Sequence, residues 1–220
     1  MLAMAAHGAA EGDWLIADTQ TAGRGRMGRA WQSQAGNLYA TGLVRLRADD
    51  PDAATLALVA AVALYDTVAL WVDAAKLRLK WPNDLLSDGA KLSGILLERA
   101  GDAVVIGIGV NLAHHPETLD RPVTSLAAVG GMSPEPGIFL ETLAETFARW
   151  LASWRGDGLA MMRTAWLTRA HVVGTALTAN LPDGQRIDGL FDGLTEDCAL
   201  QLRLADGAVR VIHAGDVFLI

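Results

Sequence analysis

The sequence has little of three features that mark secreted, membrane-spanning or nucleic-acid-coating proteins. A single cysteine, Cys198, stands among 220 residues, so no internal disulfide can form and a reducing compartment such as the cytoplasm is indicated. The formal net charge of -7 argues against broad electrostatic attraction to nucleic acid. The longest uncharged apolar run, residues 53–65, is shorter than the ~20 residues of a membrane span. No basic segment typical of a secretory signal opens the chain, so we expect a soluble cytoplasmic protein.

Apolar residues make up 51% of the chain, which is enough for the packed core of a medium-sized domain with a small appendage. Apolar spacing predicts helices over residues 2–10, 53–71, 138–154 and 159–170. Runs of β-type residues predict strands over residues 14–17, 38–46, 76–80, 85–86, 91–98 and 102–112. Residues 114–136 are rich in proline and glycine and are predicted to form a loop.

The residue pattern changes after His171, where short runs of β-type residues alternate with Asp-Gly or Gly-Asp turns. This spacing is typical of a small antiparallel barrel. The sequence therefore predicts an α/β (α+β) fold, with a mixed-sheet catalytic domain over residues 1–170 and a β-barrel domain over residues 171–220.

The most distinctive segment is Gly23-Arg24-Gly25-Arg26-Met27-Gly28-Arg29. Its glycines allow close approach of the backbone to a ligand, and its arginines offer planar forks that match phosphate or carboxylate. The glycines also fit G-x-G-x-x-G, but no helix pattern follows them, which argues against a dinucleotide-binding fold. An ordinary glycine-rich turn with solvated arginines is the simplest alternative. We interpret the segment as a loop that wraps a small anionic ligand.

A second cluster of polar residues begins at Lys80-Trp81-Pro82-Asn83-Asp84, where a predicted strand ends. A lysine there can reach a phosphate as a point charge, and the Asn-Asp pair can hold a ribose, a base or hydrated Mg²⁺. Lys91 and Gly94 then place a cation beside a position without a side chain. Each residue alone fits a solvated turn, so the prediction depends on their combination with the Gly/Arg loop.

Four segments together resemble the biotin protein ligases, the biotin–[acetyl-CoA-carboxylase] ligases, of the monofunctional type. The matching segments occur in the family's order and spacing, and they are residues 20–29, 80–84, 91–96 and 107–112. The resemblance extends from about Gly12 to the C-terminus and implies a biotin/lipoate ligase-type domain followed by an SH3-like β-barrel.

The resemblance implies an ATP-dependent ligase with biotin as substrate and Mg²⁺ as its metal. The biotin carboxylate attacks the α-phosphate of ATP to give biotinyl-5′-AMP and pyrophosphate. A lysine amine of a biotin carboxyl carrier protein then attacks the mixed anhydride and releases AMP. Cations are needed where charge develops, and a loop that excludes water protects the intermediate.

The resemblance also implies a role for each matching residue. Lys91, Arg26 and Asp84 are the expected catalytic residues, and Asp84 is a candidate for orienting the incoming lysine amine. The expected biotin-binding residues are Gln20, Gly23, Arg24, Gly25, Arg26, Lys91 and Gly94. The expected ATP-binding residues are Arg29, Trp31, Lys80, Asn83, Asp84 and Asn111. The metal ligands are left open.

The N-terminal region departs from the family pattern. Family members carry a strand ending in Ser-Thr-Asn, whose Ser and Thr contact biotin, and then a helix before the Gly/Arg loop. The present sequence starts within that helix, so we expect both contacts to be missing. No helix-turn-helix segment precedes the ligase region, and DNA binding is not expected. A homodimer is possible, but the sequence does not decide the oligomeric state.

Two alternatives remain open from the sequence. A lipoate or octanoate attachment enzyme shares the superfold but is not expected to combine the Gly-Arg-Gly-Arg loop with Lys-Trp-Pro-Asn-Asp. A non-catalytic binding protein that retains biotin contacts is the second alternative.

Overall fold

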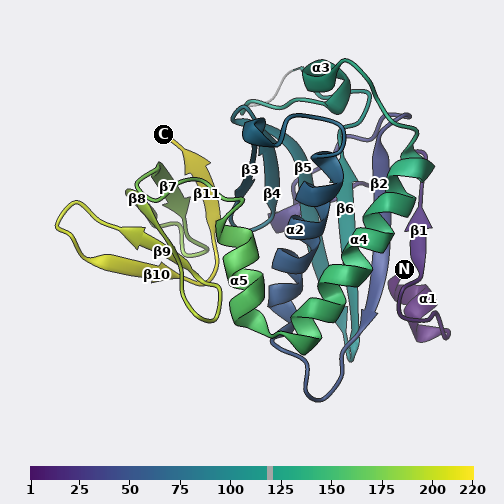
Figure 1. Ribbon diagram of the computed structural model, residues 1–220, viewed down its shortest axis with the longest axis horizontal. Helices are drawn as coiled ribbons and strands as arrows, with labels where there is room; N and C mark the ends of the chain where they lie inside the picture. The colour runs from purple at the N-terminus through teal and green to yellow at the C-terminus, as the bar shows by residue number, and fades with distance from the viewer. Residues whose placement is uncertain (118–120) are drawn as a thin grey trace.

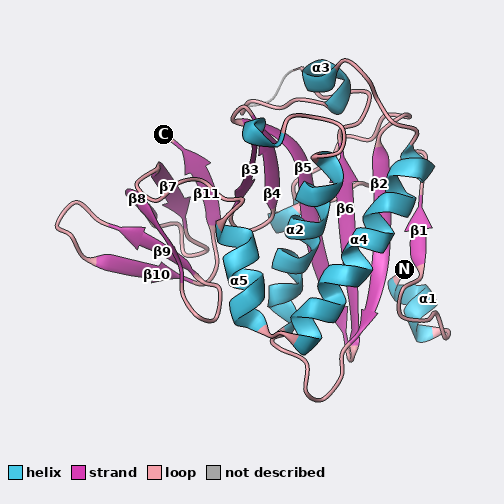
Figure 2. Cartoon of the chain, viewed as in Figure 1, coloured by secondary structure: helices cyan, strands magenta, loops and turns pink. Residues whose placement is uncertain are grey.

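The computed structural model describes residues 1–117 and 121–220 and contains two β-sheets (Figures 1 and 2). The larger sheet has six strands in the spatial order β1-β2-β6-β5-β4-β3. Their bounds are β1 Trp14–Ile16, β2 Leu38–Arg45, β3 Leu77–Lys80, β4 Asp84–Ser87, β5 Ala90–Ala100 and β6 Ala103–Val110. The predicted strands are confirmed, with β4 starting one residue earlier than expected.

Every ladder of the larger sheet is antiparallel, so the mixed sheet predicted from the sequence is corrected. Among the described residues, parallel pairing occurs as isolated bridges, such as the one between Lys91 and Val123. The antiparallel order follows from short connections: β4 and β5 are joined through Asp88 and Gly89, which both take positive φ. Short hairpins leave no room for the helical crossovers that parallel strands need.

Helices cover one face of the larger sheet. These are α2 (Leu56–Val68), α4 (Pro136–Gly156) and α5 (Leu159–Leu167), and they run across the front of the sheet in Figure 1. Helix α2 is apolar on nearly every side and lies fully within the core, as its composition predicts. Its predicted first turn is instead a short 3₁₀ segment, Ala53–Thr55, capped by the Asp52 side chain. Burial of this face leaves the opposite face of the sheet available for a site.

The N-terminal helix α1 (Leu2–Ala6) packs away from the other helices. Ala5 contacts a small apolar cluster that contains Leu43 of β2 and Val105 of β6. A further short helix, α3 (Leu126–Gly130), lies within the segment predicted to be a loop, and its first turn is capped by the Ser125 hydroxyl. Residues 118–120 of that predicted loop lie outside the described residues.

The second sheet lies beside α5 and β3, at the left of Figure 1, and its five strands have the order β10-β9-β8-β7-β11. Their bounds are β7 Ala176–Asn180, β8 Arg186–Leu194, β9 Leu200–Arg203, β10 Val209–Ile212 and β11 Asp216–Leu219. The predicted small C-terminal β domain is confirmed as an antiparallel sheet. Within the described residues no ladder joins β10 to β11, so the expected barrel is not closed by hydrogen bonds. The boundary at residue 170 stays a prediction.

Contacts between the two sheets bring the end of the chain to the first sheet. Lys80 donates from Nζ to the Val217 carbonyl at 2.7 Å, and Trp81 donates from Nε1 to the Cys198 carbonyl at 3.3 Å. The C-terminal strand β11 thus lies against the turn that follows β3. Searching the described residues for a helix with the length and apolarity of a membrane span finds none.

Candidate functional site

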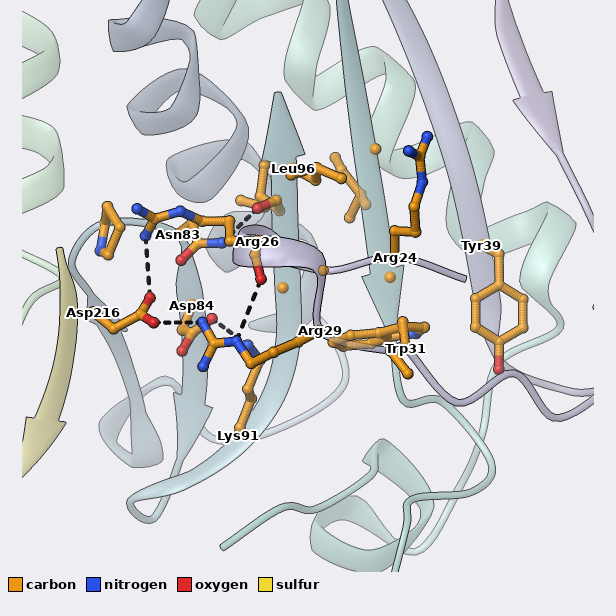
Figure 3. Close-up of a pocket in the computed structure, with 18 of the residues that line it drawn as sticks. Arg24, Arg26, Arg29, Trp31, Tyr39, Asn83, Asp84, Lys91, Leu96 and Asp216 are labelled. Carbon is orange, nitrogen blue, oxygen red and sulfur yellow. Dashed lines mark hydrogen bonds and ion pairs between the residues drawn. The ribbon is translucent and has the colours of Figure 1, made fainter. Parts of the chain in front are cut away.

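A cavity of about 210 Å³ opens on the face of the larger sheet that α2 and α4 leave uncovered (Figure 3). Its walls come from three parts of the chain: the Gly/Arg loop, strands β2 to β6, and strand β11. Most residues predicted from the sequence line it, namely Gln20, Arg24, Gly25, Arg26, Arg29, Trp31, Lys80, Asn83, Asp84, Lys91 and Gly94. The fold therefore brings together segments that are far apart in the sequence, by 187 residues in the Arg29–Asp216 pair.

The Gly/Arg loop is a small hairpin. Trp31 donates its backbone N–H to the Gly23 carbonyl at 2.9 Å, and Gly25 donates to the Arg29 carbonyl at 2.7 Å. A single 3₁₀ turn, Arg26–Gly28, forms the tip, where Met27 has φ 54° and Gly28 has φ 71°. Two successive left-handed residues reverse the chain sharply, and glycine accepts that conformation without strain. The hairpin directs Arg24 toward Glu98, and both Arg26 and Arg29 toward Asp216.

Asp216 of β11 holds the tip of this hairpin. Its carboxylate lies 2.7 Å from Nη2 of Arg29 and 3.6 Å from Nη1 of Arg26. Arg26 also donates to the Gly215 carbonyl at 3.2 Å. Figure 3 shows both guanidinium groups directed at this one carboxylate. Burial lowers the pKa of Arg26 although Asp216 and Asp84 oppose the change, so its positive charge is incompletely compensated.

Asp84 of β4 lies between two ammonium groups. Its Oδ1 accepts a short hydrogen bond from Lys91, and its Oδ2 lies 3.0 Å from Nζ of Lys80. Burial raises the pKa of Asp84, but the two cations outweigh burial and hold that pKa below its usual range. Burial lowers the pKa of Lys91, and this effect exceeds the opposing attraction of Asp84. The cluster has two cations and one anion, a charge excess suited to an anionic ligand.

The indole of Trp31 lies along the floor of the cavity, over two glycines (Figure 3). A Cβ on Gly109 would come within 2.7 Å of Trp31 Cε2, and one on Gly94 within 3.2 Å of both Trp31 Cζ3 and Lys91 Nζ. Nζ of Lys91 lies 5.6 Å from the centre of the indole. Side chains at Gly94 and Gly109 would therefore displace the ring or fill the cavity.

Two predicted residues do not line the cavity. Asn111 is buried, and its Nδ2 donates to the Thr124 carbonyl at 3.0 Å, which ties the end of β6 to the loop before α3. Gly23 lies where a Cβ would come within 2.5 Å of the Trp31 carbonyl, so it permits the hairpin to close. Both residues shape the site from outside it.

The structure adds residues that the sequence reasoning missed. Asp216 and Phe218 come from the second sheet, and Glu98 of β5 lies 3.4 Å from Nη2 of the exposed Arg24. Arg121 also lines the cavity, and its Nε is buried without a hydrogen-bond partner among the described residues. Alternating Gly107 and Gly109 on one strand gave a usable signal for a close ligand approach. No local pattern marks the other four.

The described residues offer no metal site made by protein side chains alone. In the part of the chain that is described, no group of three or more His, Cys, Asp or Glu side chains lies at metal-binding distance. Both oxygens of Asp84 already face ammonium groups, and the Asp216 carboxylate faces two guanidinium groups. A divalent cation at either carboxylate would be repelled by its neighbours. The excess of cations over carboxylates that line the cavity instead fits an anionic ligand.

Comparison with known proteins points in one direction. Residues 6–111 match the Biotin/lipoate A/B protein ligase family, and residues 176–220 match the Biotin protein ligase C terminal domain. A biotin–[acetyl-CoA-carboxylase] ligase of Paracoccus denitrificans is 42% identical over 216 residues, covering 93% of this chain and 89% of the relative. A biotin–[acetyl-CoA-carboxylase] ligase of Mycobacterium tuberculosis is 36% identical over 222 residues, which cover 99% of this chain and 83% of the relative. A solved structure of an Aquifex aeolicus biotin protein ligase in complex with biotin and ATP superposes with a TM-score of 0.85. That match covers 97% of this chain and 91% of the other at 24% identity, so it establishes the shared fold.

Proposed function

Since the chain belongs to the biotin protein ligase family, we propose that it activates biotin with ATP and transfers it to a carrier lysine. The acceptor is the biotin carboxyl carrier domain of a carboxylase, in line with the names of the two most similar relatives cited above. The reaction joins two anions, a carboxylate and a triphosphate, before it forms a mixed anhydride. The site must therefore neutralise negative charge and keep water away from the product.

One observation carries this proposal: four of the cations that line the cavity share only two carboxylates, beside a floor of glycine and tryptophan. Arg26 and Arg29 reach it from the hairpin, and Lys80 and Lys91 from the β3–β5 region. Their compensation comes from Asp84 and Asp216 alone among the close ion pairs described above. A bound carboxylate or phosphate would supply the missing negative charge.

In the first step Lys91 and Arg26 would hold the carboxylate of biotin beside the α-phosphate of ATP. The carboxylate oxygen attacks the α-phosphorus, and pyrophosphate leaves with the electron pair of the broken P–O bond. Lys80 and Arg29 would lie on the nucleotide side, with Trp31 and Asn83. Asn83 donates its amide to the Ile95 carbonyl at 2.5 Å, which fixes the turn after β3 against β5.

The uncharged end of biotin would lie between the hairpin base and the sheet. Gln20, Arg24 and Gly25 line the cavity and would contact this end, and Gly94 leaves space beside Lys91. The fused rings of biotin are compact and apolar apart from the ureido group, so they suit a wall with few side chains and a small number of polar contacts. This placement assigns the Gly/Arg hairpin to cover the ligand as well as to bind it.

Magnesium would enter with ATP as a complex of the triphosphate. Mg²⁺ commonly keeps several water ligands and takes phosphate oxygens rather than an all-protein cage. The engaged carboxylates of the cavity support that arrangement, since they offer no unpaired acidic cluster. The residues of this chain would orient the phosphates, and the cation would offset their charge when bound.

The decisive experiment incubates the protein with ATP and Mg²⁺ and either biotin or lipoate, with and without a biotin carboxyl carrier domain. Pyrophosphate release and mass labelling of the carrier are followed together. Biotin-dependent release and carrier labelling would support the proposal. Lipoate-dependent release would favour an attachment enzyme for that acid, and biotin binding without release would favour a non-catalytic binding protein.

A further inference from the structure

The proposed reaction creates a hazard for the site that performs it. A mixed anhydride acylates amines, and the chain has three lysines, Lys76, Lys80 and Lys91, two of which line the cavity. We propose that Asp84 protects the site from acylating itself by keeping Lys91 and Lys80 protonated, and that Lys91 is the latent modification site. This inference rests on the proposed function, because it needs an acyl phosphate in the cavity.

The contacts of the two lysines differ in a way that singles out Lys91. Lys80 has three neighbours: Asp84 at 3.0 Å, the Val217 carbonyl at 2.7 Å and the ring of Phe218 at 5.7 Å. Lys91 contacts Asp84 and lies 5.6 Å from the Trp31 ring centre, and within the described residues Asp84 is its single anionic partner. If Asp84 lost its charge, Lys91 would have no carboxylate partner among the described residues. Lys80 would still donate to the Val217 carbonyl.

The surroundings of Lys91 favour loss of its proton once Asp84 is neutral. The side chains of Lys80, Lys91 and Asp84 are each at most 12% exposed, so water screens the cluster weakly. The other charged groups that line this cavity include Arg26, Arg29 and Arg121, with Asp216 already paired to the first two. Burial lowers the pKa of Lys91, and repulsion from Arg121 and Lys80 adds to that effect. Asp84 is the group that opposes them.

The unwanted step is a simple aminolysis. The lone pair of a neutral Lys91 Nζ attacks the acyl carbon of biotinyl-AMP, an amide N–C bond forms, and the bond from the acyl carbon to the phosphate oxygen breaks. AMP leaves with that electron pair, and the proton lost from nitrogen passes to water. A protonated Lys91 has no lone pair to donate, so it can hold the acyl phosphate without attacking it. The carrier lysine, which arrives from solvent, then has no competitor inside the cavity.

The test adds preformed biotinyl-AMP to the wild-type protein and to Asp84→Asn, Asp84→Glu and Asp84→Asn/Lys91→Arg variants, without carrier. Supplying the intermediate makes the readout independent of the adenylation step. Biotinyl adducts are mapped by peptide mass spectrometry, and Lys76 serves as an internal reference because it is exposed and outside the cavity. The adduct at Lys91, relative to that at Lys76, is expected to rise roughly tenfold or more in Asp84→Asn. Asp84→Glu should restore protection, and Asp84→Asn/Lys91→Arg should lose the new adduct.

Two results would overturn the inference. One is a folded Asp84→Asn protein that binds biotinyl-AMP and shows no rise at Lys91 or Lys80. The other needs no variant: wild-type protein whose Lys91 is acylated at neutral pH as readily as Lys76, which decides the matter even if Asp84→Asn does not fold. A parallel arm with wild-type protein, biotin, ATP and carrier tests the proposed function separately. Carrier labelling there with no rise in the variant would reject protection by Asp84 and leave the ligase function standing.

Discussion

Two ion clusters, one around Arg155 and one in the cavity, differ in how their charges are balanced. At one end of the sheet, Arg155 of α4 lies 2.7 Å from Glu11 and 3.0 Å from Asp50, and it donates to the Arg45 carbonyl at 2.9 Å. In the cavity, two lysines share Asp84, and two arginines share Asp216. At its centre the Arg155 cluster has one cation between two carboxylates, and the exposed Arg47 lies 3.3 Å from Glu11. In the cavity, Asp84 and Asp216 each serve two cations.

The pKa shifts follow this difference. The hydrogen bonds that Arg155 donates to Glu11 raise the pKa of Arg155 and lower the pKa of Glu11 to about 2, so the two groups stabilise each other's charge. In the cavity, burial lowers the pKa values of Lys91 and Arg26 despite their acidic neighbours. The first cluster is complete within the protein and fixes the segment before β1 to α4. The second would be completed by an anionic ligand.

The strongest test of this comparison removes a cavity cation. Lys91→Met should lower kcat/KM for biotin-dependent pyrophosphate release by roughly 10²–10³-fold, because a positioned charge is lost where negative charge develops. The thermal midpoint should change little, since the substitution also removes an excess positive charge. Lys76→Met is the matched control, because Lys76 lies outside the cavity. A tenfold or smaller loss at Lys91 would contradict its proposed role.

The sequence predicted the two-part fold and most of the cavity because those features have local causes. Alternating apolar residues specify the strands, and the hairpin at residues 23–31 carries its own glycines and arginines. Asp216, Phe218 and Arg121 could not be found in this way. Asp216 and Phe218 reach the cavity because the second sheet packs against the first, and Arg121 lies close to the bridge between Lys91 and Val123. Their positions depend on tertiary packing, which no short sequence pattern predicts.

The same distinction explains why Asn111 lies outside the cavity. Asn111 ends a strand next to the site, and a strand-end amide can turn either toward a ligand or toward the following loop. Its hydrogen bond to Thr124 selects the loop. The all-antiparallel order of the larger sheet was missed for a related reason, because strand alternation gives burial but not the direction of the neighbouring strand.

The next largest effect is expected at the balanced cluster. Arg155→Leu should lower the free energy of unfolding by about 2–4 kcal/mol, since it leaves Glu11 and the nearly buried Asp50 without their shared partner. Chemical denaturation measures this value. Arg149→Leu on the same helix is the control, because Arg149 is exposed and should change stability by about 0.5 kcal/mol or less. An equal loss in both variants would mean that the cluster contributes no specific stability.

Acid should weaken the balanced cluster in a defined pH range. The pKa of Glu11 is held at about 2, below its ordinary value of 4.5, so folding favours the charged form. Its contribution is therefore complete above pH 4.5 and is lost as the pH falls toward about 2. Glu11→Gln should remove roughly 1–2 kcal/mol of stability at neutral pH and flatten the profile across that range. Glu145→Gln, which changes an exposed residue of α4, is the control and should keep the wild-type dependence of stability on pH. If stability in Glu11→Gln still falls steeply between pH 4.5 and 2, a group other than Glu11 causes the acid sensitivity.

The smallest effect is expected where a charge pair is exposed, even though it lies at the cavity. Nη2 of Arg24 lies 3.4 Å from Oε1 of Glu98, and the two side chains are 67% and 38% exposed. Solvent therefore screens their attraction, and the pair contributes about 0–1 kcal/mol to stability. Arg24→Gln should leave thermal stability almost unchanged, as should Arg186→Gln, which alters a similarly exposed pair with Asp188 in the second sheet. The two variants should differ in the biotin assay. Arg24→Gln is expected to raise the KM for biotin roughly threefold to tenfold, because one polar contact is lost, and Arg186→Gln is expected to leave that KM unchanged. If both variants keep the wild-type KM, the base of the hairpin does not contact biotin through Arg24, and ligand binding depends on the partly buried cations at its tip.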